Sequence, residues 1–366
     1  MLMQYKQYGK TGKNISVIGC GGMRFLKDGE NYDLDKCAAV VQKANELGVN
    51  YFDTAPGYNQ DMSEIIFGHA FKNMPKPFYV ATKSNLTDGN AVRKQIETSL
   101  KRFNLPKIHF FHIWTIKSLD EYKVRMKKGG AYEGALQAKK EGLIEHLVFS
   151  THCTGEEIET IVKDGVFEGV TLGYNILNFP FRQQGIKAAY EHGMGVAVMN
   201  PLSGGIIPRK PEIFDYIKNP DDKDVTAAAL RFLVAHKEIT TSLCGMATIE
   251  EVLEDVKAGE SIKAFPESKK EEIKKRLSHS MDKLCTGCQY CAGCPEGVAV
   301  AKHMLAYNQT ILDNRGRYFD FMKWHWDMSP DQVDACNECG ACEKKCTQHL
   351  KIIQRLKEIS KWSKSA

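Results

Sequence analysis

One stretch of the chain, residues 51–73, shows how the fold is built: YFDTAPGYNQDMSEIIFGHAFKN. Its first five residues, YFDTA, form a short apolar run of the kind found in buried strands. Its last eleven residues, SEIIFGHAFKN, carry apolar side chains at helical spacing. The stretch therefore predicts one strand that is followed closely by one helix.

The same strand–helix unit recurs along the first two-thirds of the chain. From Ile15 to about Gly259, short β-rich runs alternate with amphipathic helical segments, and eight such units can be counted. Eight units over roughly 250 residues have the size of an α/β fold of the (β/α)8 TIM-barrel type. The predicted strands cover residues 15–22, 51–55, 78–83, 108–114, 146–151, 169–175, 195–201 and 240–245.

A doubly wound open sheet is the alternative architecture for this alternation. Such a sheet would usually carry a glycine-rich phosphate-binding turn after its first strand. The residues at that place, GCGGMRF (19–25), depart from the GxGxxG spacing. We therefore expect the barrel.

Composition bounds the function. The chain has 366 residues, 43% hydrophobic and 26% charged, with a net charge of +5 from 50 basic and 45 acidic residues. This balance is typical of a globular protein and gives no reason to expect a nucleic-acid or membrane partner. The amino-terminal residues do not form a signal peptide, and no stretch has the length of a transmembrane helix. We expect a cytoplasmic protein.

The cysteines are distributed unevenly. Of the twelve, four lie singly and are expected to be small buried hydrophobic residues in a reducing compartment: Cys20, Cys37, Cys153 and Cys244. The other eight form two tight runs in the last quarter of the chain: Cys285, Cys288, Cys291 and Cys294, then Cys336, Cys339, Cys342 and Cys346. A disulfide scaffold is disfavoured, because no secretory signal accompanies the runs and adjacent CxxC pairs make poor structural crosslinks.

The spacing within the two runs predicts two [4Fe–4S] clusters. Three cysteines at CxxCxxC spacing can hold three corners of one cluster, and in two-cluster ferredoxins the fourth cysteine of each run binds the other run's cluster. Cys346 would then complete the first site and Cys294 the second. Two features depart from the usual pattern, since the first run closes with two intervening residues and Thr347 stands where a proline usually follows. Structural zinc is the alternative, although two CxxC pairs would suffice for it.

These patterns divide the chain into three parts. We expect a barrel over residues 1–262, a linker and surface helix over 263–284, and a small, mainly helical ferredoxin-type domain over 285–366. The last part is too short and too rich in cysteine to be expected to fold around a conventional apolar core. Its stability should therefore depend on its inorganic centres.

Several landmarks resemble the aldo-keto reductase family in the same order along the chain. They include YFDTAPGYNQDMSEIIFGHAF, VATKSN, FFHIW, FST before His152, GYNIL, VMNPLSGG and ALRF. The resemblance covers about residues 3–258. The cysteine-rich segments CTGCQYCAGCP and CNECGACEKKC resemble the carboxy-terminal domain of an iron–sulfur-fused branch of this family.

The resemblance implies a catalytic set made of Asp53, Tyr58, Lys83 and His112. Reduction of a carbonyl requires a hydride at carbon and a proton at oxygen. A phenol is a poor acid at neutral pH, and a nearby ammonium such as that of Lys83 lowers its pKa. Asp53 would hold the lysine in place, and His112 would orient the carbonyl or assist proton transfer.

The resemblance also implies a nicotinamide cofactor, NADH or NADPH. The residues expected to contact it are Ser150, Gly245, Met246, Thr248, Glu251 and Asp255. Glu250 and Glu251 stand where the family commonly has arginine, and like charges repel a 2′-phosphate. Thr171 stands where a glutamine often contacts the nicotinamide. We therefore expect NADH to be preferred.

Two functions are consistent with these features. The first is an oxidoreductase that acts on a small carbonyl or alcohol, with two clusters that exchange electrons with a redox partner such as a ferredoxin. The second is an electron-transfer or regulatory protein that uses the barrel as a docking scaffold. The complete catalytic set favours the first, because a scaffold has no need of a lysine-activated phenol.

Overall fold

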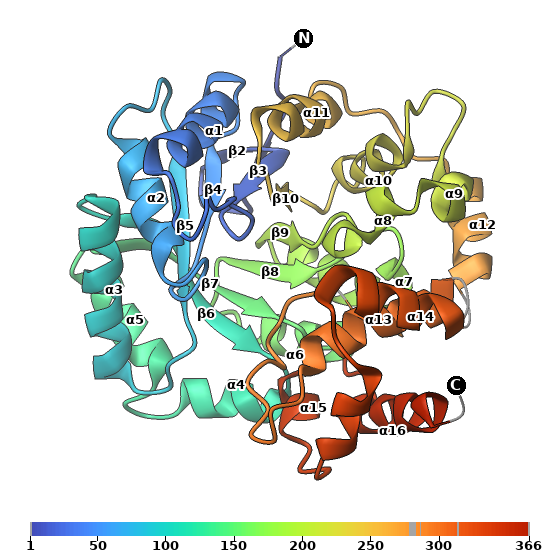
Figure 1. Ribbon diagram of the computed structural model, residues 1–366. Coiled ribbons are helices and arrows are strands. Elements are labelled where there is room, and N and C mark those ends of the chain that lie inside the picture. Colours follow the sequence, from blue (N-terminus) through green and yellow to red (C-terminus); the bar gives the residue numbers. More distant parts are fainter. Residues whose placement is uncertain (1, 278–282, 286, 313–314, 365–366) are drawn as a thin grey trace. The chain divides into compact units, whose positions relative to one another are not determined.

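The computed structural model describes residues 2–277, 283–285, 287–312 and 315–364. Eight parallel strands close into a barrel, in the order in which they occur along the chain, and helices surround them (Figure 1). The strands are β3 (Ile18–Gly21), β4 (Tyr51–Asp53), β5 (Tyr79–Ser84), β6 (Ile108–Ile116), β7 (Ile144–Thr151), β8 (Gly169–Gly173), β9 (Gly195–Met199) and β10 (Thr241–Cys244). The predicted (β/α)8 barrel is confirmed.

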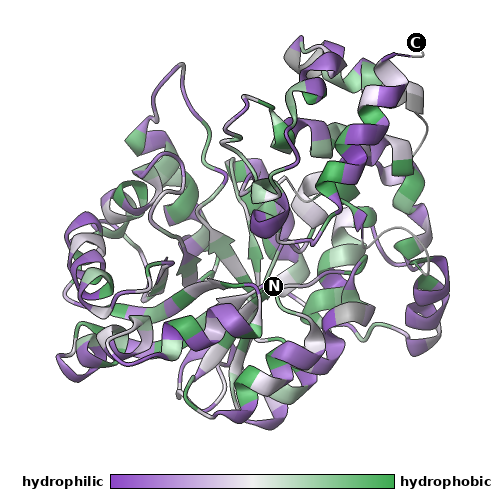
Figure 2. Cartoon of the chain, turned by 90° about the horizontal axis from the view of Figure 1, so that it is seen from below, coloured by the Kyte–Doolittle hydropathy of each residue, from purple (hydrophilic) through white to green (hydrophobic). Residues whose placement is uncertain are grey.

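One helix packs outside the barrel after each strand. These helices are α1 (Leu34–Glu46), α2 (Met62–Phe71), α3 (Gly89–Phe103), α5 (Ala131–Lys140), α6 (Gly155–Lys163), α7 (Phe179–Glu191), α10 (Val225–Val234) and α11 (Ile249–Gly259). Figure 2 shows both hydrophobic and hydrophilic residues along these helices, as expected for elements with one buried and one solvated face. A further helix, α4 (Leu119–Met126), lies in a segment for which the sequence predicted no structure.

The first predicted strand, residues 15–22, is divided in the structure. Asn14–Ser16 forms β2, which pairs antiparallel with β1 (Tyr5–Gln7), and only β3 enters the barrel. Tyr8, which follows β1, is fully buried among residues of the barrel core. A Cβ atom at Gly195 would lie 2.0 Å from the Tyr8 ring, so the close approach of this ring requires glycine at the start of β9.

The chain divides into two compact units, one formed by Met1–Leu202 with Ile217–Pro266 and one by Ser203–Tyr216 with Glu267–Ala366. The second unit thus includes the segment that leaves β9, with η1 (Ser203–Gly205), α8 (Ile206–Arg209), α9 (Pro211–Phe214) and most of η2 (Asp215–Ile217). Its other elements are α12 (Glu267–Leu277), α13 (Val300–Leu312), α14 (Arg315–Trp326), η4 (Pro330–Ala335), α15 (Ala341–Lys345) and α16 (Ile352–Ser363). Part of the expected linker and surface helix, residues 278–282, lies outside the described residues.

The second unit has an apolar core, contrary to the expectation from its length and cysteine content. Met304, Tyr318, Met322, Ile352 and Ile359 are fully buried, and they share one cluster with Cys285, Cys291 and Cys346. Because α13, α14 and α16 each contribute one face, about a hundred residues enclose enough apolar surface to pack. In the part of the chain that the structure describes, no helix is both long and apolar enough to span a membrane.

Candidate active site

Three of the four expected catalytic residues lie on neighbouring barrel strands. Asp53 is the last residue of β4, Lys83 the fifth of the six in β5, and His112 lies within β6. Lys83 and His112 are register partners. Tyr58 lies in the loop that follows β4. Because the carboxyl ends of the strands meet at one rim of the barrel, the four residues come from one sector of that rim.

Asp53 and Lys83 form a buried ion pair. The Lys83 Nζ atom donates hydrogen bonds to Asp53 Oδ1 at 2.5 Å and to the Thr54 carbonyl oxygen at 2.6 Å. Lys83 is 1% exposed and Asp53 5%. Burial raises the pKa of the Asp53 carboxyl and lowers the pKa of the Lys83 ammonium, while their mutual attraction opposes both shifts. Each charge is therefore tolerated only because the other is present.

The Tyr58 ring is close to both Lys83 and an aromatic side chain. The Lys83 Nζ atom is 5.4 Å from the centroid of the Tyr58 ring, and the Trp114 ring meets it edge-on at 5.7 Å between centroids. Trp114 lies where the β6–β7 register shifts. The next residue, Thr115, has a φ of 60°, and its N–H donates to Ser150 Oγ at 3.2 Å. This bulge sets the direction of Trp114.

His112 is fully buried and hydrogen-bonded through both ring nitrogens. Its Nδ1 lies 3.3 Å from the Thr82 carbonyl oxygen, which can only accept, so Nδ1 carries the hydrogen. Burial, reinforced by the nearby Lys83 charge, holds the pKa of His112 well below its usual range, so the ring is neutral. Its Nε2 therefore accepts the hydroxyl hydrogen of Thr171 at 2.9 Å. In the sequence, Thr171 stood out only because the family often has a glutamine at this position. Its contact with His112 could not be deduced from the sequence.

The expected cofactor loop lies between β10 and α11. Thr248 caps α11 and accepts the N–H of Glu251 at 3.3 Å. The Glu251 carboxylate in turn accepts the N–H of Ala247 at 2.7 Å. At Gly245, a Cβ atom would lie 2.5 Å from Cγ of Arg24. Arg24 is a basic residue beside this loop that could not be expected there from the sequence, because it is distant along the chain.

The remaining expected cofactor residues are buried. Met246 is fully buried, Ser150 is 1% exposed and Asp255 6%. Burial, with the nearby charge of Glu251, raises the pKa of Asp255 to about 7, and the Cys244 thiol is among its hydrogen-bond partners. Cys244 is the register partner of Cys20 on β3. All four single cysteines are free and buried, as expected.

The eight clustered cysteines line two small cavities in the second unit. One cavity is lined by Cys285, Cys288, Cys291 and Cys346, together with apolar residues such as Met304 and Ile352. The other is lined by Cys291, Cys294, Cys336, Cys339 and Cys342. Two backbone N–H groups, those of Gly287 and Leu350, donate to Cys285 Sγ and Cys346 Sγ at 3.4 Å each.

These cysteines do not converge on one point. Among the described residues, no three histidine, cysteine, aspartate or glutamate side chains are arranged to hold a single metal ion. Burial raises the pKa of the Cys285 and Cys291 thiols to about 12. These side chains are therefore neutral unless a positive centre binds them.

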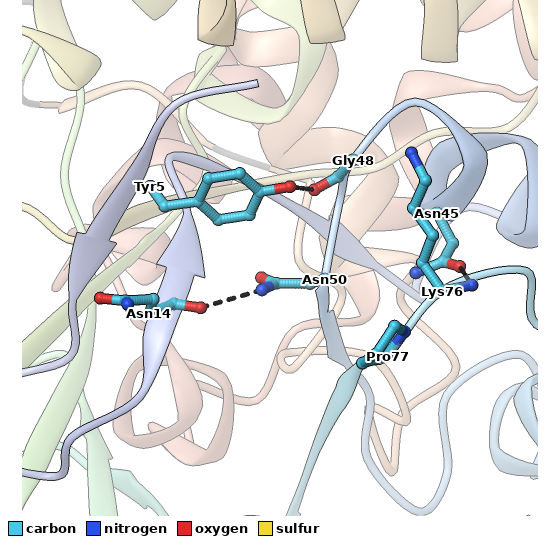
Figure 3. A pocket seen from close by; sticks show the side chains of 7 residues that line it. All are labelled: Tyr5, Asn14, Asn45, Gly48, Asn50, Lys76 and Pro77. Atoms are coloured by element: carbon cyan, nitrogen blue, oxygen red, sulfur yellow. Dashed lines mark hydrogen bonds between the residues drawn. The ribbon is translucent and has the colours of Figure 1, made fainter. Parts of the chain in front are cut away.

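A larger hollow, of about 410 Å³, lies on the barrel unit but away from the catalytic set. Five of its seven lining residues precede β4 or β5, at the amino ends of these strands, and the other two, Tyr5 and Asn14, lie on β1 and β2. Figure 3 shows that its polar groups are bonded to each other: the Tyr5 hydroxyl donates to the Gly48 carbonyl, and Asn50 donates to the Asn14 carbonyl. Barrel enzymes carry out their chemistry at the opposite, carboxyl rim, and the amino-terminal face usually contributes to stability. We assign it no ligand.

Comparisons with known proteins match the barrel. A sequence model described as the aldo/keto reductase family matches residues 17–277. L-galactose dehydrogenase of Arabidopsis thaliana is 28% identical over 289 residues, which are 70% of this chain and 88% of that protein. NADH-specific methylglyoxal reductase of Escherichia coli is 24% identical over 201 residues, 48% of this chain and 60% of that protein.

Solved structures show the same fold. The holo form of an aldo-keto reductase from Bacillus halodurans superposes with a TM-score of 0.64 at 22% identity, covering 75% of this chain and 96% of that one. An aldo-keto reductase from Klebsiella pneumoniae in complex with NADPH gives a TM-score of 0.62 at 16% identity, covering 76% and 96%. Both cysteine runs lie beyond the residues matched by the family model.

Proposed function

The chain belongs to the aldo/keto reductase family, and from this premise we propose that it interconverts a small carbonyl compound and its alcohol, with Tyr58 as the proton donor and acceptor. The observation that carries the proposal is the buried Asp53–Lys83 pair beside the Tyr58 ring. Burying two charges is expensive and adds little stability compared with apolar packing. A positive charge held beside a phenol, in contrast, stabilises the phenolate that forms when the proton leaves.

The state of His112 supports Tyr58 as the proton donor. The ring is neutral, and its single N–H is directed at the Thr82 carbonyl oxygen. It therefore has no proton to give at ordinary pH. The hydrogens of His112 and Thr171 are taken by the Thr82 carbonyl and by His112 Nε2, so neither residue donates to the substrate oxygen in this arrangement. We assign the proton transfer to Tyr58 alone, and to His112 and Thr171 the shaping of the site beside it.

A nicotinamide, when bound, supplies the hydride for this reaction. We propose that the residues expected from the family resemblance contact it: Ser150, Gly245, Met246, Thr248, Glu251 and Asp255. The Glu251 carboxylate already accepts the Ala247 N–H, an amide just before the N-cap of α11 that could otherwise bind a phosphate. This supports a preference for NADH over NADPH. Arg24 beside Gly245 is a basic group that opposes it.

We further propose that the second unit holds two [4Fe–4S] clusters, which accept and donate single electrons when bound. The support is the grouping of the cysteines. Cys346 lines the cavity of the first run, and Cys294 lines the cavity of the second run. A cluster presents four separate iron corners, so its cysteines surround a cavity, whereas one zinc ion would require sulfur atoms that converge to about 2.3 Å from it. A redox partner protein such as a ferredoxin would exchange electrons with them.

Replacement of Tyr58 by phenylalanine tests the central proposal. Tyr58→Phe keeps the ring beside Trp114 and removes the acidic hydroxyl, so reduction of methylglyoxal by NADH should fall about 100- to 10,000-fold. Tyr190→Phe is the matched control, because Tyr190 is 43% exposed on α7. Turnover would be followed by the loss of NADH absorbance. Turnover by Tyr58→Phe that equals that of the control would show that another group donates the proton.

A further inference from the structure

The loop that carries Tyr58 has an unfavourable backbone. Asn59, Gln60 and Asp61 follow the tyrosine directly, and all three have positive φ angles, of 55°, 58° and 70°. A run of three such residues, none of them glycine, is disfavoured by contacts between Cβ and the backbone. A conformation of this kind persists only when surrounding contacts impose it.

One aspartate closes this loop around Tyr58. The Oδ1 atom of Asp61 accepts the backbone N–H of Gly57, the residue before the tyrosine, at 3.1 Å. The same oxygen accepts a hydrogen bond from Arg102 Nη1, on α3, also at 3.1 Å. Asp61 occupies the N-cap position of α2, but its side chain makes no capping hydrogen bond there. Its carboxylate therefore bonds to the Gly57 amide in the loop and to Arg102, instead of capping α2.

The same guanidinium nitrogen is also linked, through Glu64, to the strand that carries Lys83. Arg102 Nη1 donates to Glu64 Oε2 at 2.9 Å, and the Glu64 side chain is 1% exposed. The other oxygen of Glu64 accepts the hydroxyl of Thr82 at 2.7 Å. Thr82 directly precedes Lys83 on β5, and its carbonyl oxygen accepts the His112 N–H. Arg102 is thus connected to the Tyr58 loop and to the strand that carries Lys83.

We propose that Arg102 is a positioning residue that holds the Tyr58 loop and the Lys83 strand in one geometry, through Asp61 on one side and Glu64 on the other. The inference rests on the proposed function, in which the phenol and the ammonium act together. Reacting groups that shift by about 1 Å can lose about 100-fold in rate. Asp61 and Glu64 lie three residues apart at the start of α2, so Arg102 binds this turn to α3, and Glu64 binds it to the Thr82 hydroxyl on the Lys83 strand.

The variants separate the contact of Arg102 with Asp61 in the loop from its contact with the buried Glu64. Asp61→Gly removes the carboxylate, and glycine tolerates a φ of 70°. Asp61→Asn keeps an oxygen that can accept from Gly57 and Arg102. Arg102→Gln removes the contacts with both Asp61 and Glu64. Arg93→Gln is the matched control on the same helix, since its partners are Glu97 on α3 and Glu141 at the C-cap of α5.

Two measurements are made on each variant. Hydrogen exchange with mass spectrometry of the segment 54–62 reports the Gly57 amide without any substrate. Steady-state reduction of methylglyoxal by NADH reports kcat and KM over a range of pH. For Asp61→Gly and Arg102→Gln we expect faster exchange in this segment and a kcat about 10- to 100-fold lower, with KM changed by less than about threefold. Asp61→Asn should retain most of the turnover, and Arg93→Gln should match the parent.

The outcomes distinguish this inference from the proposed function. If Asp61→Gly and Arg102→Gln exchange and turn over like Arg93→Gln while Tyr58→Phe is inactive, the positioning role is refuted and the proposed function stands. If Tyr58→Phe retains turnover, the proposed function fails. If the parent does not reduce methylglyoxal, the exchange rates decide by themselves: faster exchange in Asp61→Gly alone, and not in Arg102→Gln, would overturn the role of Arg102.

Discussion

Replacing Lys83 by methionine should destabilise the barrel strongly. The substitution keeps most of the aliphatic volume but removes the ammonium that donates to Asp53 and Thr54. The Asp53 carboxylate is 5% exposed. Its other oxygen, Oδ2, has no hydrogen-bond partner in the part of the chain that the structure describes. The variant would therefore contain a buried carboxylate without a counter-charge.

The size of the effect follows from that burial. Removing one partner of a buried ion pair costs about 3–5 kcal/mol. For a domain of this size, about 1 kcal/mol lowers the Tm by roughly 2–4 °C, so the barrel transition should fall by about 6–20 °C. A double variant, Lys83→Met with Asp53→Asn, removes both charges. It should recover most of the loss, because the penalty belongs to the unpaired charge.

The loss of stability in Lys83→Met should increase as the pH rises. Burial already raises the pKa of Asp53 in the folded protein, and removal of Lys83 raises it further. In the window between the unfolded pKa, about 3.9, and the higher folded pKa, the folded state binds more protons than the unfolded state. Stability is therefore retained below that window and lost as the pH rises through it. Lys83→Met should be closer to the parent at about pH 5 than at about pH 8.

Thermal unfolding followed by circular dichroism at both pH values provides the assay. Lys163→Met is the control, because Lys163 is 61% exposed and pairs with Glu159 on the surface of α6. It should stay within about 0.5 kcal/mol of the parent. The reasoning is refuted if Lys83→Met is as stable as Lys163→Met at the higher pH, or if the double variant is no more stable than the single one.

Three further results are expected. Cys288→Ala and Cys339→Ala should each lower the iron content of anaerobically purified protein and its charge-transfer absorbance, and unchanged iron in both would contradict the clusters. NADH should bind more tightly than NADPH, and Glu251→Gln should narrow the gap in Kd; tighter binding of NADPH by the parent would contradict this electrostatic argument. Thr171→Val should cost about 1–3 kcal/mol, because it leaves His112 Nε2 buried without a donor, and an unchanged Tm would disprove that contact.

The second unit has an apolar core that its sequence does not reveal. The segment was expected to lack a conventional core, because its length is small and its cysteines are many. In the structure, Met304, Tyr318 and Ile359 come from three helices and are buried together. Apolar residues on separate helices contribute to a core only when the helices pack against each other. Helical periodicity within one segment does not reveal that packing.

The sequence by itself determined the barrel, the order of its strands and the positions of Asp53 and Lys83 at or next to strand ends, whereas His112, also expected at a strand end, lies in the middle of the longer β6. The sequence could do so because alternation of strand and helix is a local pattern, and because parallel strands joined by helices have few ways to close. The spacing of Cys285 to Cys294 is equally local. These features can be deduced without knowledge of any long-range contact.

The tertiary structure alone decided which groups meet. Thr171 donates to His112 across 59 positions of the chain, and Arg102 reaches Asp61 and Glu64 across 41 and 38 positions. It also decided that β2 pairs with β1 instead of continuing into β3. Each of these contacts depends on the direction of a side chain or strand after the barrel has closed. A hydrogen bond requires its two atoms to lie within about 3 Å of each other, and only the closed barrel brings such distant residues that close.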